Sequence, residues 1–124
     1  ANSGKQQKKI IKQEGAEKII EAPNFMVLRL ISGEAACYYA AGTKWCTSEP
    51  EVFKSYAKDG DIYVIIVKDQ QGRTRKFQYH YESGQVMNER DAPISKADIK
   101  LLSSFPEWYQ FVDMQVQRHY KELK

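Results

Sequence analysis

The chain has 124 residues, of which 42% are hydrophobic and 28% are charged, and this is the size and balance of a single ordinary globular domain. No apolar run approaches the ~20 residues that a membrane-spanning helix needs, and no apolar segment typical of a signal peptide stands near the start. Two cysteines, Cys37 and Cys46, are too few for a disulfide scaffold, so we expect reduced thiols, with a Cys37–Cys46 bridge as the alternative.

The net charge of +3 belongs to the N-terminal segment. Residues 1–20 hold five lysines against two glutamates, so residues 21–124 are neutral as a whole. A basic arm that includes Lys8, Lys9 and Lys12 is suited to contact phosphate groups. The alternative is a solvated terminus without a partner.

The first part of the chain predicts a tail, a helix and a strand. Residues 1–7 are polar and are expected to form a disordered tail ahead of a single domain over residues 8–124. Isoleucines and alanine at loosely helical spacing predict an amphipathic helix over residues 8–21, which Pro23-Asn24 ends. The mostly apolar run over residues 25–30 has the length of a strand.

Two helices are predicted next, with a short connection between them. Ser32 is a suitable N-cap for a helix over residues 33–41, and Gly42 suits the position after its end. Ser48-Glu49-Pro50-Glu51 forms a capping box that begins a helix ending near Asp59-Gly60. The connection Gly42-Thr43-Lys44-Trp45-Cys46-Thr47-Ser48 therefore lies between a helix end and a helix start.

The middle of the chain predicts a meander of strands. Residues 62–67 are apolar and β-branched on both faces, which is typical of a central strand covered on both sides. Residues 74–81 alternate, and Val86-Met87 begins a further short strand. On the alternating strand the aromatic side chains Phe77, Tyr79 and Tyr81 share one face, and Lys76, Gln78 and His80 share the other.

The C-terminal part predicts a short capped helix from Ser95 and a longer helix from the Ser104–Glu107 capping box to about Tyr120. Trp108, Phe111, Val112 and Val116 form one apolar stripe on that helix. The fold class is therefore α+β: an antiparallel meander of three to four strands, with helices packed on one face.

Cys46 is the candidate catalytic nucleophile, with His80 as its base. Cys46 stands just ahead of a predicted helix start, where backbone dipoles favour a thiolate, and Lys44 is two positions away. The alternative is a packed, structural cysteine beside Trp45, and Cys37 in its alanine-rich helix is expected in the core. No cluster of histidines or cysteines has the spacing of a metal site, and no cofactor motif is present, so we expect no metal and no cofactor.

Basic and aromatic residues provide the candidate binding surface. Lys44, Arg73, Arg75 and Lys76 are expected to contact phosphate or acidic side chains, while Trp45 stacks. Tyr79 and Tyr81 are either a stacking platform with basic edges or core residues beneath the last helix. The Walker spacing is absent, which excludes a nucleotide-hydrolysing loop at Gly42-Thr43-Lys44.

A succession of short motifs over residues 16–94 resembles a domain found in many tailed-bacteriophage proteins. The motifs are Glu34-Ala35-Ala36-Cys37, Gly42-Thr43-Lys44-Trp45-Cys46-Thr47, Phe53 with Tyr56, Gly60 to Ile66, Lys76 to Glu82, and Met87 with Glu89 and Asp91. The chain is more distantly similar to the PcfJ-like domain of mobile elements, although Trp45 stands where that domain has its usual histidine. The resemblance implies a phage or mobile-element origin and a location in the host cytoplasm or the virion, and it implies no reaction.

These observations favour a non-enzymatic binding module whose partner is nucleic acid or a host or phage protein. The first alternative is a thiol-dependent hydrolase or transferase that uses Cys46 and His80. The second is a structural virion component that forms homo-oligomers through the Trp108–Val116 stripe.

Overall fold

The computed structural model of the chain describes residues 15–43 and 61–122. Residues 15–43 hold two strands and a helix, and residues 61–122 hold three strands followed by two helices. In chain order the elements are β1 (Ala16–Ala22), β2 (Phe25–Leu30), α2 (Gly33–Tyr39), β3 (Ile62–Lys68), β4 (Thr74–His80), β5 (Gln85–Met87), α4 (Lys96–Ser103) and α5 (Pro106–Glu122).

The strands form one antiparallel sheet in the order β1-β2-β3-β4-β5, so each strand pairs with its neighbour in the chain. This confirms the α+β class and the meander. Over residues 15–43 and 61–122 the sheet has five strands, where three to four were expected. The added strand is β1.

The prediction of a helix over residues 8–21 is wrong for the part that the structure describes, because Ala16–Ala22 is β1. Pro23 and Asn24 form a two-residue turn that places Ala22 opposite Phe25, so β1 and β2 make a hairpin. The register of the β1–β2 pair shifts between Lys18 and Ile20, which marks a β-bulge. Because of this bulge, the adjacent Ile19 and Ile20 fit into a strand, although their spacing is also compatible with a helix.

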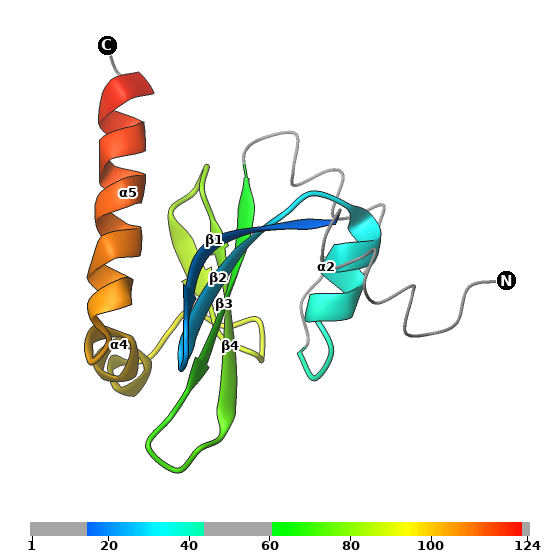
Figure 1. Cartoon of the computed structure of the whole chain (residues 1–124), viewed down its shortest axis with the longest axis vertical. Helices are drawn as coiled ribbons and strands as arrows, with labels where there is room; N and C mark the ends of the chain where they lie inside the picture. Colours follow the sequence, from blue (N-terminus) through cyan, green and yellow to red (C-terminus); the bar gives the residue numbers. More distant parts are fainter. Residues whose placement is uncertain (1–14, 44–60, 123–124) are drawn as a thin grey trace, which may run out of the picture.

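Helices cover both faces of the sheet, whereas the sequence suggested one (Figure 1). On one face, Leu28 of β2 and Val64 of β3 pack against Ala35 and Ala36 of α2. On the other face, aromatic and aliphatic side chains of β2, β3 and β4 pack against Leu102 of α4 and Phe111 of α5. The apolar character of β3 on both sides is thus accounted for, since each of its faces lies beneath a helix.

The helix boundaries largely follow their capping residues. The hydroxyl of Ser32 accepts a hydrogen bond from the backbone N–H of Ala35 and begins α2, as predicted. Ser95 forms a capping box with Asp98 at the start of α4. Ser104, predicted to cap the last helix, instead ends α4, where its hydroxyl donates to the carbonyl of Leu101. The predicted helix from Ser48 lies outside the described residues.

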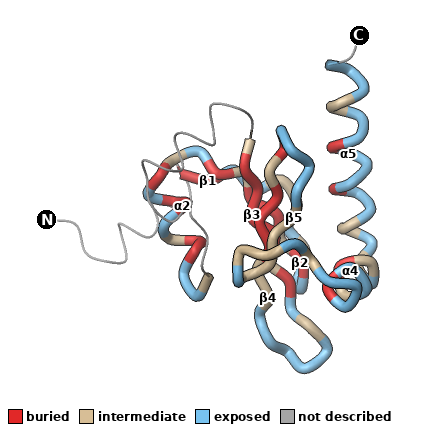
Figure 2. The backbone as a smooth tube through the Cα atoms, turned by 180° about the vertical axis from the view of Figure 1, so that it is seen from behind, coloured by how far each residue is buried: buried red, intermediate tan, exposed pale blue. Residues whose placement is uncertain are grey.

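The helix α5 is buried along one side only (Figure 2). Phe111 and Gln115 face the sheet and are buried, whereas Val112 and Val116 are exposed. The expected single stripe of Trp108, Phe111, Val112 and Val116 is therefore divided between two sides of the helix.

Candidate functional site

A polar groove lies beside the open edge of β4, where the β3–β4 turn, the loop after β5 and the start of α4 meet. Its volume is about 680 Å³. β5 pairs only with Gln78–His80, so no described strand covers the edge of β4 from Thr74 to Phe77. We call this feature the arginine groove; its lining residues are Gly42, Asp69, Arg73, Thr74, Arg75, Asn88, Glu89, Arg90, Ser95 and Asp98.

The floor of the arginine groove is a closed set of ion pairs around Arg75. The guanidinium binds Glu89 with both arms, at 2.7 Å from Nε to Oε2 and 3.1 Å from Nη2 to Oε1, and it donates to Asp98 Oδ1 at 2.9 Å. Glu89 Oε2 also accepts a hydrogen bond from the backbone N–H of Lys76 at 3.3 Å. Arg75, predicted to contact a partner, therefore has both carboxylates as internal partners.

The electrostatics keep this floor ionised. The hydrogen bond to Glu89 raises the pKa of Arg75, against the opposing effect of burial. Burial acts to raise the pKa of Glu89 and Asp98, but hydrogen bonds from Arg75 and from backbone N–H groups prevail, so both pKa values are lowered. One arginine thus faces two carboxylates, and the floor carries a surplus of negative charge.

Arg73 lies on one rim of the groove, at the end of a braced turn. Asp69 Oδ1 accepts hydrogen bonds from the backbone N–H of Gln71 at 3.0 Å and of Arg73 at 2.9 Å. Gly72 has a φ of 77°, which glycine adopts without strain. The Arg73 side chain is 74% exposed, and its Nε is 3.7 Å from Asp69, too far for a strong hydrogen bond. The turn thus fixes the backbone and leaves the guanidinium in solvent.

Arg90 also lines the groove, in a second braced loop. The side-chain oxygen of Asn88 accepts hydrogen bonds from the backbone N–H of Arg90 at 2.9 Å and of Ala92 at 3.2 Å. Asp91 has a φ of 59°, in the left-handed region that few residues other than glycine adopt. Arg90 is exposed at the tip of this loop. Two exposed guanidiniums are therefore presented by two rigid turns.

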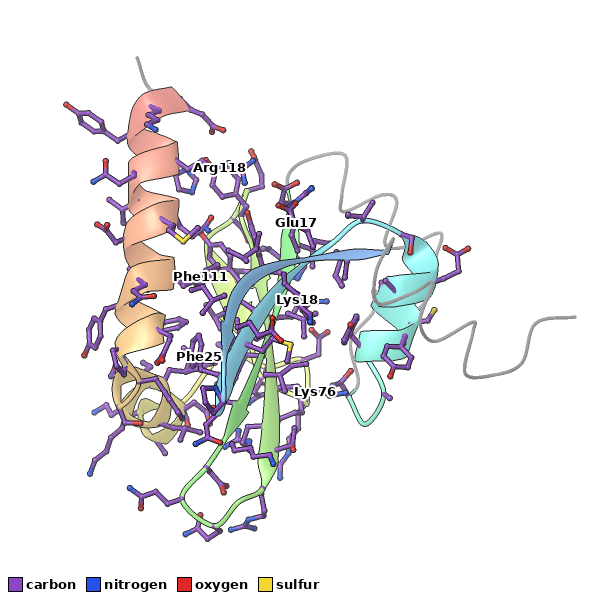
Figure 3. All side chains as sticks on the ribbon, in the orientation of Figure 1. Glu17, Lys18, Phe25, Lys76, Phe111 and Arg118 are labelled. Atoms are coloured by element: carbon purple, nitrogen blue, oxygen red, sulfur yellow. The ribbon has the colours of Figure 1, made fainter. Side chains whose placement is uncertain are left out.

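Lys76 does not belong to the groove. Its side chain extends from the other face of β4 toward the end of α2 (Figure 3). The ammonium donates to the carbonyls of Tyr39 at 3.1 Å and Ala41 at 2.8 Å. These carbonyls have no partner within the helix, and a lysine near a helix end is the usual way to satisfy them. Burial lowers the pKa of Lys76. The residue expected to contact a partner thus has a structural role.

His80, the candidate base, lies on the α2 side of β4 and is half-buried. Its Nε2 is 2.9 Å from the side-chain oxygen of Gln78. Burial lowers the pKa of His80, and the charge of Asp91 opposes this effect. Burial thus favours the neutral imidazole, which is the form that a general base needs. Cys46 lies outside the described residues, so the catalytic pair stays a prediction.

Tyr79 of β4 and Tyr81, which directly follows β4, belong to the core, which was the alternative to a stacking platform. Tyr79 is 8% exposed and packs edge-on against Phe111, with ring centroids 5.4 Å apart. Tyr81 is 3% exposed and stacks on His119 at 4.1 Å, with Arg118 over its other side at 3.7 Å. Neither ring has a face open to a base.

Several predicted residues lie outside the described part of the chain: Lys8, Lys9, Lys12, Lys44 and Trp45. Cys37, expected in the core, is exposed on α2. Arg90, Glu89 and Asp98 were not predicted as site residues. The polar loop after β5 was a local indication of Glu89 and Arg90, whereas Asp98 lies in α4. The contacts of Glu89 and Asp98 with Arg75 depend on the fold.

Within residues 15–43 and 61–122, no group of three or more His, Cys, Asp or Glu side chains is arranged to hold a metal ion. No described helix has both the length and the apolar surface to cross a membrane. A scan against protein-family models, a search of curated proteins and a search of solved structures each found no match.

Proposed function

We propose that the chain is a non-enzymatic binding module that holds a polar segment of a partner protein in the arginine groove. The observation that carries the proposal is the pair Arg73 and Arg90, two exposed arginines on braced turns that line the same groove. The braced turns fix the backbone at both arginines, so only the side chains have to be ordered when the guanidiniums bind carboxylates. A setting in a phage or mobile element remains a prediction from the resemblance of residues 16–94.

The charge of the groove favours a protein partner over nucleic acid. Three arginines line it, and so do three carboxylates, those of Asp69, Glu89 and Asp98. Binding to a phosphate backbone needs a surplus of positive charge, since its affinity comes largely from counterion release. A neutral groove with fixed positive and negative positions is better suited to a peptide that carries both charges.

The test is a selection of 12-residue peptides displayed on phage, with the variant Arg73→Glu/Arg90→Glu used for counter-selection. We expect selected peptides to lose at least about tenfold in affinity with that variant, as measured by fluorescence anisotropy. The matched control is Lys18→Glu/Lys100→Glu, which changes the net charge equally at exposed sites that do not line the groove. This control should bind the selected peptides as the parent does.

Labelled oligonucleotides distinguish the other class of partner. A 20-nucleotide single strand and a 20-base-pair RNA duplex are titrated at low and moderate salt. If either oligonucleotide binds the parent tightly, and if Arg73→Glu/Arg90→Glu weakens this binding whereas the control variant does not, the partner of the groove is nucleic acid and the proposal of a protein partner is overturned. If no selected peptide depends on Arg73 and Arg90, the groove is not a protein-binding site.

A further inference from the structure

Glu89 lies on the floor of the arginine groove in the way that a carboxylate of a bound ligand would lie. Its two oxygens accept hydrogen bonds from both arms of Arg75, at 2.7 and 3.1 Å, and one of them also accepts from the backbone N–H of Lys76 at 3.3 Å. A two-armed contact with a guanidinium is the geometry by which arginine recognises carboxylates. We call the Arg75 guanidinium and the Lys76 N–H the carboxylate subsite.

The donors of the carboxylate subsite have supports other than Glu89. The backbone of Lys76 is fixed within β4, opposite Ile66 of β3. The Arg75 guanidinium also donates to Asp98 at 2.9 Å, and its Cζ lies over the ring of Phe77, 5.2 Å from the ring centre. The side chain of Asp98 is 8% exposed and is held in the capping box of α4. We therefore expect the donors to keep their positions when the carboxylate of Glu89 leaves.

Glu89 reaches the subsite from a loop that has backbone hydrogen bonds of its own. The N–H of Asn88 donates to the carbonyl of Ala92 at 2.8 Å, and the N–H of Asp91 donates to the carbonyl of Asn88 at 3.0 Å. Glu89, by contrast, contacts β4 through its side chain. Rotation of this one side chain therefore withdraws the carboxylate from β4 while these backbone bonds of the loop stay formed.

The carboxylate subsite is accessible from the groove. The side chains of Arg75 and Glu89 are 29% and 25% exposed, and both line the groove. Water therefore reaches the ion pair, and a carboxylate of a partner has the same access. Such a carboxylate replaces Glu89 by an equivalent group, so the donors stay paired and the exchange changes the free energy little.

We propose that an acidic side chain of the partner segment binds the carboxylate subsite and that Glu89 is an internal competitor, which the partner displaces. The inference rests on the proposed function of the arginine groove, and it adds the group that the floor recognises and a limit on the affinity. The apparent affinity is reduced by the fraction of molecules in which Glu89 fills the subsite. Once displaced, Glu89 is an anion in the groove that a basic side chain of the same segment can pair with.

Two libraries of 12-residue peptides displayed on phage test the proposal, one with a fixed central glutamate and one with a fixed central glutamine. Both are selected against the parent and against Glu89→Ala. We expect peptides from the glutamate library to bind Glu89→Ala at least about tenfold more tightly than the parent, as measured by fluorescence anisotropy, because the internal competitor is removed. Replacing the central glutamate of these peptides by glutamine should abolish the gain.

The matched control is Glu82→Ala, the same change of residue and charge at an exposed position that does not line the groove. This variant should bind the peptides as the parent does. Circular dichroism establishes that the variants are folded. A second measurement needs no variant: in the parent saturated with a selected peptide, the side-chain carboxyl ¹³C signal of Glu89 should move toward that of the solvated Glu82, because its contact with Arg75 is lost.

The failure of this inference is distinguishable from the failure of the proposed function. If selected peptides depend on Arg73 and Arg90 but Glu89→Ala does not raise their affinity, the internal competitor is overturned and the binding module stands. A gain that Glu82→Ala reproduces is an effect of net charge and also overturns the inference. If neither the parent nor Glu89→Ala binds any peptide, both proposals are overturned.

Discussion

The two faces of the sheet are closed by different means. On the α2 face, small side chains such as Ala35 and Ala36 pack against aliphatic residues of β2 and β3. On the α5 face, large rings fill the space instead: Phe25, Phe77 and Tyr79 pack with Phe111. Close approach of a helix needs small residues, and a more distant helix needs aromatic ones to maintain dense packing.

The two faces also satisfy their polar groups differently. On the α5 face, Arg118 joins the helix to the sheet by donating to Asp61 at 2.8 Å and to the hydroxyl of Tyr63 at 3.0 Å. On the α2 face, one lysine satisfies carbonyls at a helix end. Side-chain ion pairs thus fasten α5, whereas α2 depends on a bond between a side chain and the backbone. Substitutions on each face test this difference.

The largest effect is expected from Phe111→Ala. Phe111 is 1% exposed and contacts Tyr63, Tyr79 and Trp108, so its removal leaves a cavity in the aromatic layer. We expect a loss of about 3–5 kcal/mol in the free energy of unfolding, measured in urea. Met114→Ala, on an exposed part of the same helix, should change it by less than about 0.5 kcal/mol. Equal losses would show that α5 is not anchored by its inner side.

Lys76→Met tests the α2 face. The methionine retains most of the aliphatic stem but cannot donate to the carbonyls of Tyr39 and Ala41. We expect a loss of roughly 1–2 kcal/mol, because partly buried carbonyls at the helix end lose a charged donor. Lys68→Met at an exposed position of β3 is the control and should be nearly neutral. If both variants are equally stable, Lys76 does not hold the end of α2.

Gln115→Leu is expected to stabilise the protein. Gln115 is 7% exposed, and no described residue is a hydrogen-bond partner of its Oε1. Because the amide oxygen is buried without a described partner, an apolar side chain of similar size removes its desolvation cost, so we expect a gain of about 1 kcal/mol. Gln117→Leu, exposed on the same helix, provides the comparison. A destabilised Gln115→Leu would indicate that the amide has a favourable partner.

Much of the fold could be predicted from local patterns. The strands from β2 to β5 and all three described helices were expected, because their spacing and caps are properties of short segments. β1 was missed because Ile19 and Ile20 fit two periodicities around a bulge. The turn at Pro23-Asn24 was the better guide, since a two-residue connection between apolar runs indicates a hairpin.

The site could be predicted only in part, because its character depends on distant pairs. Arg75 is basic in the sequence, yet its partners Glu89 and Asp98 lie 14 and 23 residues away. Likewise, Lys76 reaches carbonyls 35 and 37 residues earlier. Alternation along β4 correctly separated the two faces, but it could not show that a helix covers the polar one.

The smallest effect is expected on the α2 face, in the dependence of stability on pH. Burial lowers the pKa of His80 below its ordinary value of 6.5, so the unfolded chain binds this proton more readily than the folded chain does. The contribution of His80 to stability is complete above pH 6.5 and is lost as the pH falls through the pKa of the folded state. His80→Gln should flatten this part of the profile in urea unfolding, whereas His119→Gln should retain it because His80 is still present. An NMR titration gives the pKa directly, and a value for His80 at or above 6.5 would contradict burial of a neutral imidazole beside Gln78.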